Sequence, residues 1–327
     1  MAPPPEVVFD RYFRGAQRRT EERRLYWGKQ DLSQLHPPLA AFLTEVQAAL
    51  NEALENEKKS VPEHVAHPPF HFDYIASDIA NALAFQSGDY SFIGVTMPLF
   101  SELWDSCVAL SRSQGVKALL EIAETPESEE AILTIMCQTQ LTFIVSHEYT
   151  HHVHGQVQVS NQGLEAQAYE MDADGYAVYH VLAHLIEGPR REQAVQLLGC
   201  EHSPTCIQDE KLLSSFVFAL GALRLSRSLS PVDLSNVYSL SHPLPVVRMN
   251  CVMRHAINWC KQNDRPDLAA YMTLNQFQVI MATVERAIVG TTTTHNWREQ
   301  AAFLKSQEGS TYLKKLDALV KAHVAAL

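Results

Sequence analysis

The residues of this chain that point most directly to chemistry form the pattern His-Glu-x-x-His: His147, Glu148 and His151. They follow an apolar run, residues 131–145, that contains no Gly or Pro and predicts a helix. Residues four apart on a helix share one face, so both imidazoles can bind a single metal ion. The intervening glutamate then points toward the open position of the metal, where it can serve as a general base.

A carboxylate farther along the chain would complete the ligand set, and Glu170 follows His151 after eighteen intervening residues. It lies in a second helix-like run, residues 164–186. Two His and one Glu leave the fourth position of Zn²⁺ to water. Asp174, one turn after Glu170, could accept a hydrogen bond from the non-ligating nitrogen of a zinc-bound His and fix its tautomer. The predicted ligands of one Zn²⁺ are therefore His147, His151 and Glu170.

The same residues have a plainer explanation. The chain holds 15 His, so the pattern can arise by chance at a histidine-rich helix end, and His152 and His154 fit that explanation. The acidic residues from Glu170 onward could simply solvate an exposed helix face. The correctly spaced carboxylate favours the metal interpretation over both alternatives.

Two further groups of potential ligands are weaker candidates. A proline-broken segment, residues 60–72, is predicted to be a surface loop that gives no shared face to its three histidines, His64, His67 and His71. A Cys-His-Cys group matches no common zinc knuckle: Cys200, His202 and Cys206. We expect neither group to bind metal.

His180 and His184 also stand four apart, on the helix predicted to carry Glu170. The helical rise places them about 15 and about 21 Å from Glu170, too far to share its metal ion. No glutamate lies between them, so a role in packing or at the surface is expected.

Composition excludes several functional classes. The formal net charge of −11 argues against nucleic acid or an anionic membrane as the main partner. The N-terminus lacks the apolar region of a signal peptide, and the longest apolar stretch, residues 212–223, is too short to span a bilayer. Six scattered Cys fit a reducing compartment. A cytoplasmic protein without a membrane span is expected.

The elements that must position the metal ligands are mostly helices. Apolar periodicity predicts helices over residues 38–58, 98–113, 128–154, 164–187, 208–226, 246–262, 266–289 and 311–326. Two strands, 79–85 and 90–96, predict a hairpin whose edge could pair with a peptide backbone beside the zinc. The predicted fold is α+β and predominantly helical, a zincin-like metallopeptidase with a small β-sheet or hairpin beside the active-site helix.

Two more motifs extend the pattern. His242-Pro243 precedes a helix expected to begin at Pro245, and Arg248 in its first turns opposes the helix dipole, so a carboxylate partner is expected. Upstream, Asn81-Ala82 leads to the second strand of the hairpin. With the zinc motif and the segment 170–174, this order resembles the gluzincin metallopeptidases. It most resembles the catalytic core of HtpX-like proteases and CAAX prenyl proteases, over about residues 78–255.

The resemblance implies roles for single residues. It implies zinc ligation by His147, His151 and Glu170, with Glu148 as the general base. It further implies that Asp174 supports the ligands, that Asn81 and His242 lie near the oxyanion, and that Arg248 anchors the site. Leu83 departs from the family, which often has an aromatic residue there. Many relatives are embedded in membranes, so a soluble relative is implied and their substrate class is not transferred.

The function expected from the sequence is that of a zinc-dependent endopeptidase, in which a glutamate activates a zinc-bound water to hydrolyse peptide bonds of a protein or peptide substrate. One alternative is a narrow-specificity regulatory or phage-defence peptidase of the Lit or ImmA/IrrE type. Another is a catalytically silent zinc-binding interaction protein, which the presence of Glu148 disfavours. The expected segments are an N-terminal helical extension (1–60), the metallopeptidase core (61–262) and a C-terminal helical segment (263–327). The sequence indicates no oligomeric state.

Overall fold

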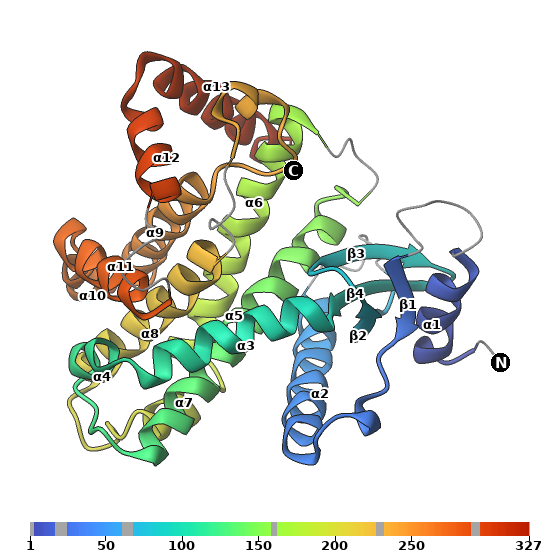
Figure 1. The fold of residues 1–327 in the computed structure, drawn as a ribbon, viewed down its shortest axis with the longest axis horizontal. Coiled ribbons are helices and arrows are strands. Elements are labelled where there is room, and N and C mark those ends of the chain that lie inside the picture. The colour runs from blue at the N-terminus through green and yellow to red at the C-terminus, as the bar shows by residue number, and fades with distance from the viewer. Residues whose placement is uncertain are drawn as a thin grey trace. The chain divides into compact units, whose positions relative to one another are not determined.

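The structure, a computed structural model, describes residues 3–16, 25–60, 68–157, 162–226, 232–288 and 295–326 (Figure 1). Most of the described residues are in helices, and four short strands form a small mixed sheet. This confirms the predicted α+β, predominantly helical class. None of the described helices is long and apolar enough to cross a membrane. His64 and His67 lie outside the described residues.

The chain divides into two compact units, an N-terminal unit (Met1–Glu102 with Glu148–Val157) and a helical unit (Leu103–His147 with Gln158–Leu327). The division falls inside helix α5 (Pro126–Val153), between His147 and Glu148. The three functional segments expected from the sequence stay a prediction, because compactness does not identify the segments that carry a function.

The sheet of the N-terminal unit has four strands in the order β1-β2-β4-β3. They are β1 (Tyr26–Lys29), β2 (Phe70–Ser77), β3 (Ala82–Ser87) and β4 (Tyr90–Thr96). The antiparallel pair β3–β4 is the predicted hairpin, and Gly88 in its turn has φ +58°, a left-handed conformation that glycine adopts readily. β2 runs parallel to β4, and β1 runs antiparallel to β2.

The loop predicted over residues 60–72 is wrong at its end, because Phe70, His71 and Phe72 begin strand β2. Most residues of β2 are buried, among them Phe70, Phe72 and Tyr74, and the preceding prolines and histidines obscured this strand. β1 pairs with residues 75–77 of β2. Nearer the start of β2, the Asn51 side chain of α2 hydrogen-bonds to the strand backbone. The Asn51 side chain accepts from the Phe72 amide at 2.8 Å and donates to its carbonyl at 3.0 Å.

Two helices of the N-terminal unit supply the apolar side chains that cover this sheet. Helix α1 (Pro5–Ala16) packs Phe9 and Phe13 into a cluster with Phe85 and Phe92 of the hairpin. Helix α2 (Pro37–Ser60) buries side chains three and four residues apart, which confirms the predicted amphipathic helix: Leu43, Val46, Leu50 and Leu54. A short 3-10 turn, Leu32–Gln34, precedes α2.

The helical unit is built mainly from the long helices α5, α6, α8 and α9. Most of the predicted helices are confirmed, with small shifts of their ends. The helices after the sheet are α3 (Met97–Arg112), α4 (Gln114–Leu119), α5 (Pro126–Val153), α6 (Gly163–Leu182), α7 (Arg191–Leu197), α8 (Thr205–Ser226), α9 (Pro245–Gln262), α10 (Pro266–Tyr271), α11 (Leu274–Ile288), α12 (His295–Lys305) and α13 (Gln307–Val324). A π-helical turn (η3, Ala183–Glu187) continues α6, and a 3-10 turn (η4, Leu234–Ser239) precedes α9.

One predicted helix, residues 266–289, is divided in the structure. Met272 leaves the helical conformation with ψ 62°, which ends α10. Thr273 then accepts a hydrogen bond from the Gln276 amide through its hydroxyl at 3.1 Å and so caps the start of α11. The apolar period continues through this break, which is why periodicity alone predicted a single helix.

Candidate metal centre

His147 and Glu170 come together where α5 and α6 meet in the helical unit. The distance from His147 Nε2 to Glu170 Oε2 is 3.3 Å. Metal–ligand bonds of about 2.0–2.1 Å in a tetrahedral zinc site place two ligand atoms about 3.3 Å apart. The side chains are 8% and 13% exposed. The two groups therefore stand at the separation that a shared zinc ion requires.

Asp174 determines which nitrogen of His147 faces Glu170. Its Oδ1 lies 3.0 Å from His147 Nδ1, an ion-pair distance, and Nε2 on the other side of the ring faces Glu170. The sequence placed Asp174 in this supporting position one turn after Glu170, and the geometry agrees with that expectation. Its functional consequence stays a prediction.

Two arginines from separate helices hold Asp174 as a buried anion. Arg248 of α9 donates from Nε to Oδ2 at 2.7 Å and from Nη2 to Oδ1 at 2.6 Å, while Arg224 of α8 donates to Oδ1 at 2.7 Å. The Asp174 side chain is 0% exposed. Burial raises its pKa, but the two arginine charges outweigh burial and hold the pKa well below the usual range. Asp174 thus ties α6, α8 and α9 together behind His147.

His151 follows His147 by one turn on the continuous helix α5, so the helix itself fixes their spacing. His151 Nδ1 lies 2.7 Å from Oε1 of Gln156, which is an acceptor, so Nδ1 carries the proton and Nε2 is the nitrogen available to a metal ion. His147, His151 and Glu170 form one of the groups of side chains in the described residues that could hold a metal ion. Their joint role as the ligands of one ion stays a prediction.

The end of α5 is attached to the sheet by residues that alternate with the candidate ligands. His152 Nε2 lies 2.9 Å from the Phe92 carbonyl oxygen of β4, so His152 donates to the strand. The rings of Tyr149 and Phe70 are 4.9 Å apart. His152 is thus a packing residue. This contact also explains one of the extra histidines at the helix end without involving it in the metal centre.

Glu148, the predicted general base, lies between the two histidines in α5 and is partly exposed. It belongs with His151 to the N-terminal unit, which also contains the hairpin. A partly exposed carboxylate can exchange protons with solvent. Its catalytic role stays a prediction.

The segment before α9 brings two more predicted residues to Glu170. Arg248 Nη1 lies 3.2 Å from Glu170 Oε2, so Arg248 contacts both carboxylates of α6, as expected for an arginine that opposes the helix dipole. His242 Nε2 lies 3.5 Å from the same oxygen, and its side chain is 58% exposed. α9 begins at Pro245, as predicted. His242 therefore stands at the solvent side of the candidate centre.

Asn81 has a defined place within the N-terminal unit. Its side-chain amide donates to the Tyr26 hydroxyl at 2.9 Å, and its backbone amide donates to the Thr96 hydroxyl at 2.8 Å. Both hydrogen bonds hold Asn81 at the residue just before β3. The predicted position of Asn81 near an oxyanion stays a prediction.

Sequence reasoning missed Arg224 and Gln156. Arg224 is the only charged residue in residues 212–225, a run whose other members are apolar or small. A single charge in a buried helix requires a partner, and that pattern could have identified it. Gln156 follows a turn after α5, where nothing in the sequence distinguishes it from a surface glutamine.

The electrostatic balance of the centre affects its first ligand. Burial lowers the pKa of His147, but the negative charges of Glu170 and Asp174 outweigh it and raise the pKa to about 9. In the absence of metal, His147 is therefore protonated at neutral pH. A metal ion would have to displace this proton to bind Nε2.

The group Cys200, His202 and Cys206 is not among the groupings of potential metal ligands in the described residues. Cys200 is buried, Cys206 is exposed, and neither forms a disulfide. His71 lies in β2, with Nε2 3.4 Å from Oδ2 of Asp73. The expectation that these groups do not bind metal stays a prediction.

Comparison with known proteins finds no family model that matches the chain, no similar curated protein and no similar solved structure. The functional interpretation therefore depends on the geometry of the residues described above.

Proposed function

We propose that this protein is a zinc-dependent peptidase with a zincin-like core of the gluzincin type. The observation that carries the proposal is the separation of 3.3 Å between His147 Nε2 and Glu170 Oε2. Asp174 Oδ1 lies 3.0 Å from His147 Nδ1, and Gln156 Oε1 lies 2.7 Å from His151 Nδ1, so both contacts favour Nε2 as the ligating nitrogen.

The donor set fits zinc better than a hard cation. Two neutral imidazoles and one carboxylate are the protein ligands of catalytic zinc sites in which a fourth position stays open. Mg²⁺ and Ca²⁺ favour oxygen ligands, of which this centre offers only one side chain. When bound, Zn²⁺ supplies Lewis acidity, which polarises a substrate carbonyl and brings the pKa of a water toward about 7.

The chain's own residues divide the remaining work. Glu148 takes a proton from the attacking water as oxygen bonds to the peptide carbon, and then delivers that proton to the leaving nitrogen as the C–N bond breaks. His242, exposed beside Glu170, is suited to donate to the developing oxyanion. Arg248 holds Glu170 in place and compensates the negative charge of the Glu170 carboxylate.

The substrate proposed is an extended peptide. The order β1-β2-β4-β3 leaves β3 at an edge of the described sheet, and the last turn of α5 is hydrogen-bonded to β4, the neighbouring strand. A peptide could add to β3 through backbone hydrogen bonds, which give affinity without a strict demand on sequence. Six free thiols fit a reducing compartment such as the cytoplasm.

Replacing Glu148 by Gln tests this function. The variant should bind zinc as the wild type does but lose about 10²- to 10⁴-fold in cleavage rate, because only the proton acceptor is removed. The measurement is cleavage of casein and of a peptide library by zinc-loaded protein, with metal content determined in parallel. Glu130→Gln, on the exposed side of the same helix, is the matched control and should keep full activity.

Two results would contradict the proposal. Equal cleavage by wild type and Glu148→Gln would exclude Glu148 as the base. Zinc bound by the three ligands without cleavage of any library peptide would instead favour a zinc-binding interaction protein.

A further inference from the structure

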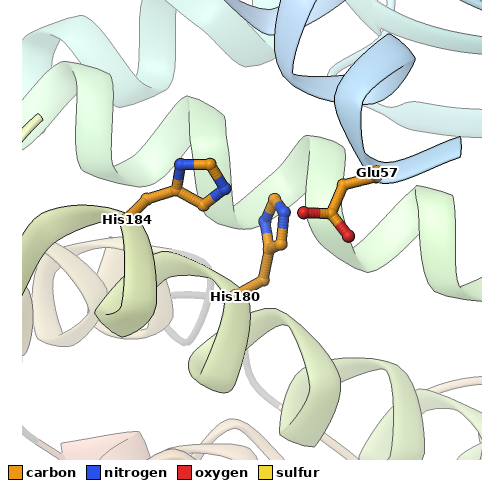
Figure 2. A group of neighbouring side chains, drawn as sticks. All are labelled: Glu57, His180 and His184. Atoms are coloured by element: carbon orange, nitrogen blue, oxygen red, sulfur yellow. The ribbon is translucent and has the colours of Figure 1, made fainter. Parts of the chain in front are cut away.

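A second pair of histidines lies in the helical unit. His180 is near the end of α6, and His184 is in the π-helical turn η3 that follows. Their ring centroids are 4.5 Å apart with an interplanar angle of 59° (Figure 2). Single π-helical turns in helices occur frequently at functional sites.

The two rings lie close enough for one metal ion to bind both. A ligand nitrogen of His180 lies within 4.8 Å of one of His184. Tetrahedral coordination with bonds of about 2.0–2.1 Å places two ligand atoms about 3.3 Å apart, which lies inside this limit. Both residues as a whole are partly exposed, whereas the His180 Nε2 atom itself is buried.

Ser146 orients His180 in the manner typical of a metal ligand. The Ser146 hydroxyl oxygen lies 2.7 Å from His180 Nδ1. With the ring proton on Nδ1, His180 donates to this oxygen and its lone pair is on Nε2. His151 Nδ1 has a similar polar contact, with Gln156 Oε1 at 2.7 Å.

We propose that His180 and His184 form a second binding site for a divalent transition metal of the zinc class, separate from the centre at His147, His151 and Glu170. Imidazole nitrogen selects zinc, copper, nickel and cobalt over magnesium and calcium. Water completes the coordination. Figure 2 also labels Glu57 of α2, which belongs to the N-terminal unit, and the two imidazoles suffice for the binding proposed here.

A metal ion at this position would join α6 to the turn where the helix changes its pitch. His180 and His184 lie on either side of the start of η3 at Ala183. Bonds from one ion to both rings would oppose unwinding of this turn, since the ion binds the folded pair and not the separated residues.

Zinc stoichiometry of the full-length, metal-free protein tests the proposal. Equilibrium dialysis against Zn²⁺ followed by elemental analysis should give two equivalents for the wild type and one for His184→Gln. His151→Gln should retain the equivalent that depends on His184. His36→Gln changes an exposed histidine and is the matched control, which should keep both.

Ser146→Ala gives a second measurement, the zinc affinity of the His184-dependent site, which should not change if these histidines serve only in packing. Loss of the hydrogen bond to His180 Nδ1 should weaken the His184-dependent site about 10-fold or more while the His151-dependent equivalent stays bound. The measurement is the zinc titration of imidazole ¹H–¹⁵N signals, in which His180 and His184 should shift together.

Failure of this inference differs from failure of the proposed peptidase. One equivalent in the wild type that is lost in His151→Gln and kept in His184→Gln overturns the second site and leaves the peptidase proposal intact. Loss of the second equivalent in His36→Gln as well as in His184→Gln would show non-specific surface binding and would also overturn it. A His184-dependent equivalent without a His151-dependent one supports the second site and refutes the peptidase centre.

Discussion

Replacing Asp174 by Asn should both destabilise the protein and weaken its metal binding. Asp174 is fully buried and contacts Arg224, Arg248 and His147 at 2.6–3.0 Å. Asparagine has nearly the same size, so the change removes the charge and leaves two arginines without their shared counter-charge. Removing one member of a buried ion pair costs about 3–5 kcal/mol. We therefore expect a loss of this size in the free energy of unfolding of the metal-free protein.

The effect of Asp174→Asn on metal binding should be separate from its effect on stability. The carboxylate orients His147 through Nδ1, and loss of such a support weakens metal binding about 10- to 100-fold. Asp209 offers a matched control, because it is also fully buried and paired with two arginines, Arg191 and Arg265. Asp209→Asn should destabilise the fold by a similar amount and leave the zinc affinity unchanged.

The assay is urea unfolding of metal-free protein, followed by zinc titration of the folded variants. A surface carboxylate gives the lower limit. Asp317→Asn removes exposed contacts with Lys321 and Arg254 and should change the unfolding free energy by less than about 1 kcal/mol. The reasoning is refuted if Asp174→Asn unfolds within about 1 kcal/mol of the wild type. It is also refuted if Asp174→Asn and Asp209→Asn reduce zinc affinity equally.

Two further predictions concern the ligand His147 and the contact that orients His151. His147 has a folded pKa raised to about 9, against an ordinary value of 6.5, so its contribution to the stability of the metal-free protein is fully present below pH 6.5 and is lost as pH rises through 9. Unfolding free energies measured across this range should fall for the wild type and stay flatter for His147→Gln; parallel curves would argue against the pKa shift. Gln156→Ala removes the acceptor that holds His151 Nδ1, so zinc affinity should fall about 10-fold in calorimetric titration, whereas the exposed Gln34→Ala should leave it unchanged.

The sequence predicted the helices well because their signals are local. Apolar residues three and four apart in α2, and the unbroken run before His147, need no information from distant parts of the chain. The spacing of Glu170 and Asp174 likewise follows from one helix. The hairpin was predictable because its strands are adjacent and joined by a turn with Gly88.

Features that depend on pairing between distant segments could not be predicted. Strand β2 pairs in parallel with β4, although β3 lies between them in the sequence. The register of β2 is therefore set by residues far apart in the chain. Its first residues follow two prolines, which indicated a loop. The convergence of Arg224 and Arg248 on Asp174 requires three helices to meet, and no local pattern specifies that arrangement.

The most direct test of the zinc centre is a crystal structure of zinc-loaded protein with anomalous data collected on both sides of the zinc absorption edge. The account predicts a peak within about 2.0–2.2 Å of Nε2 of His147, Nε2 of His151 and a carboxylate oxygen of Glu170. A zinc-saturated crystal with no peak between these three residues, or with Glu170 still held by Arg248 and turned away from the ion, would contradict it.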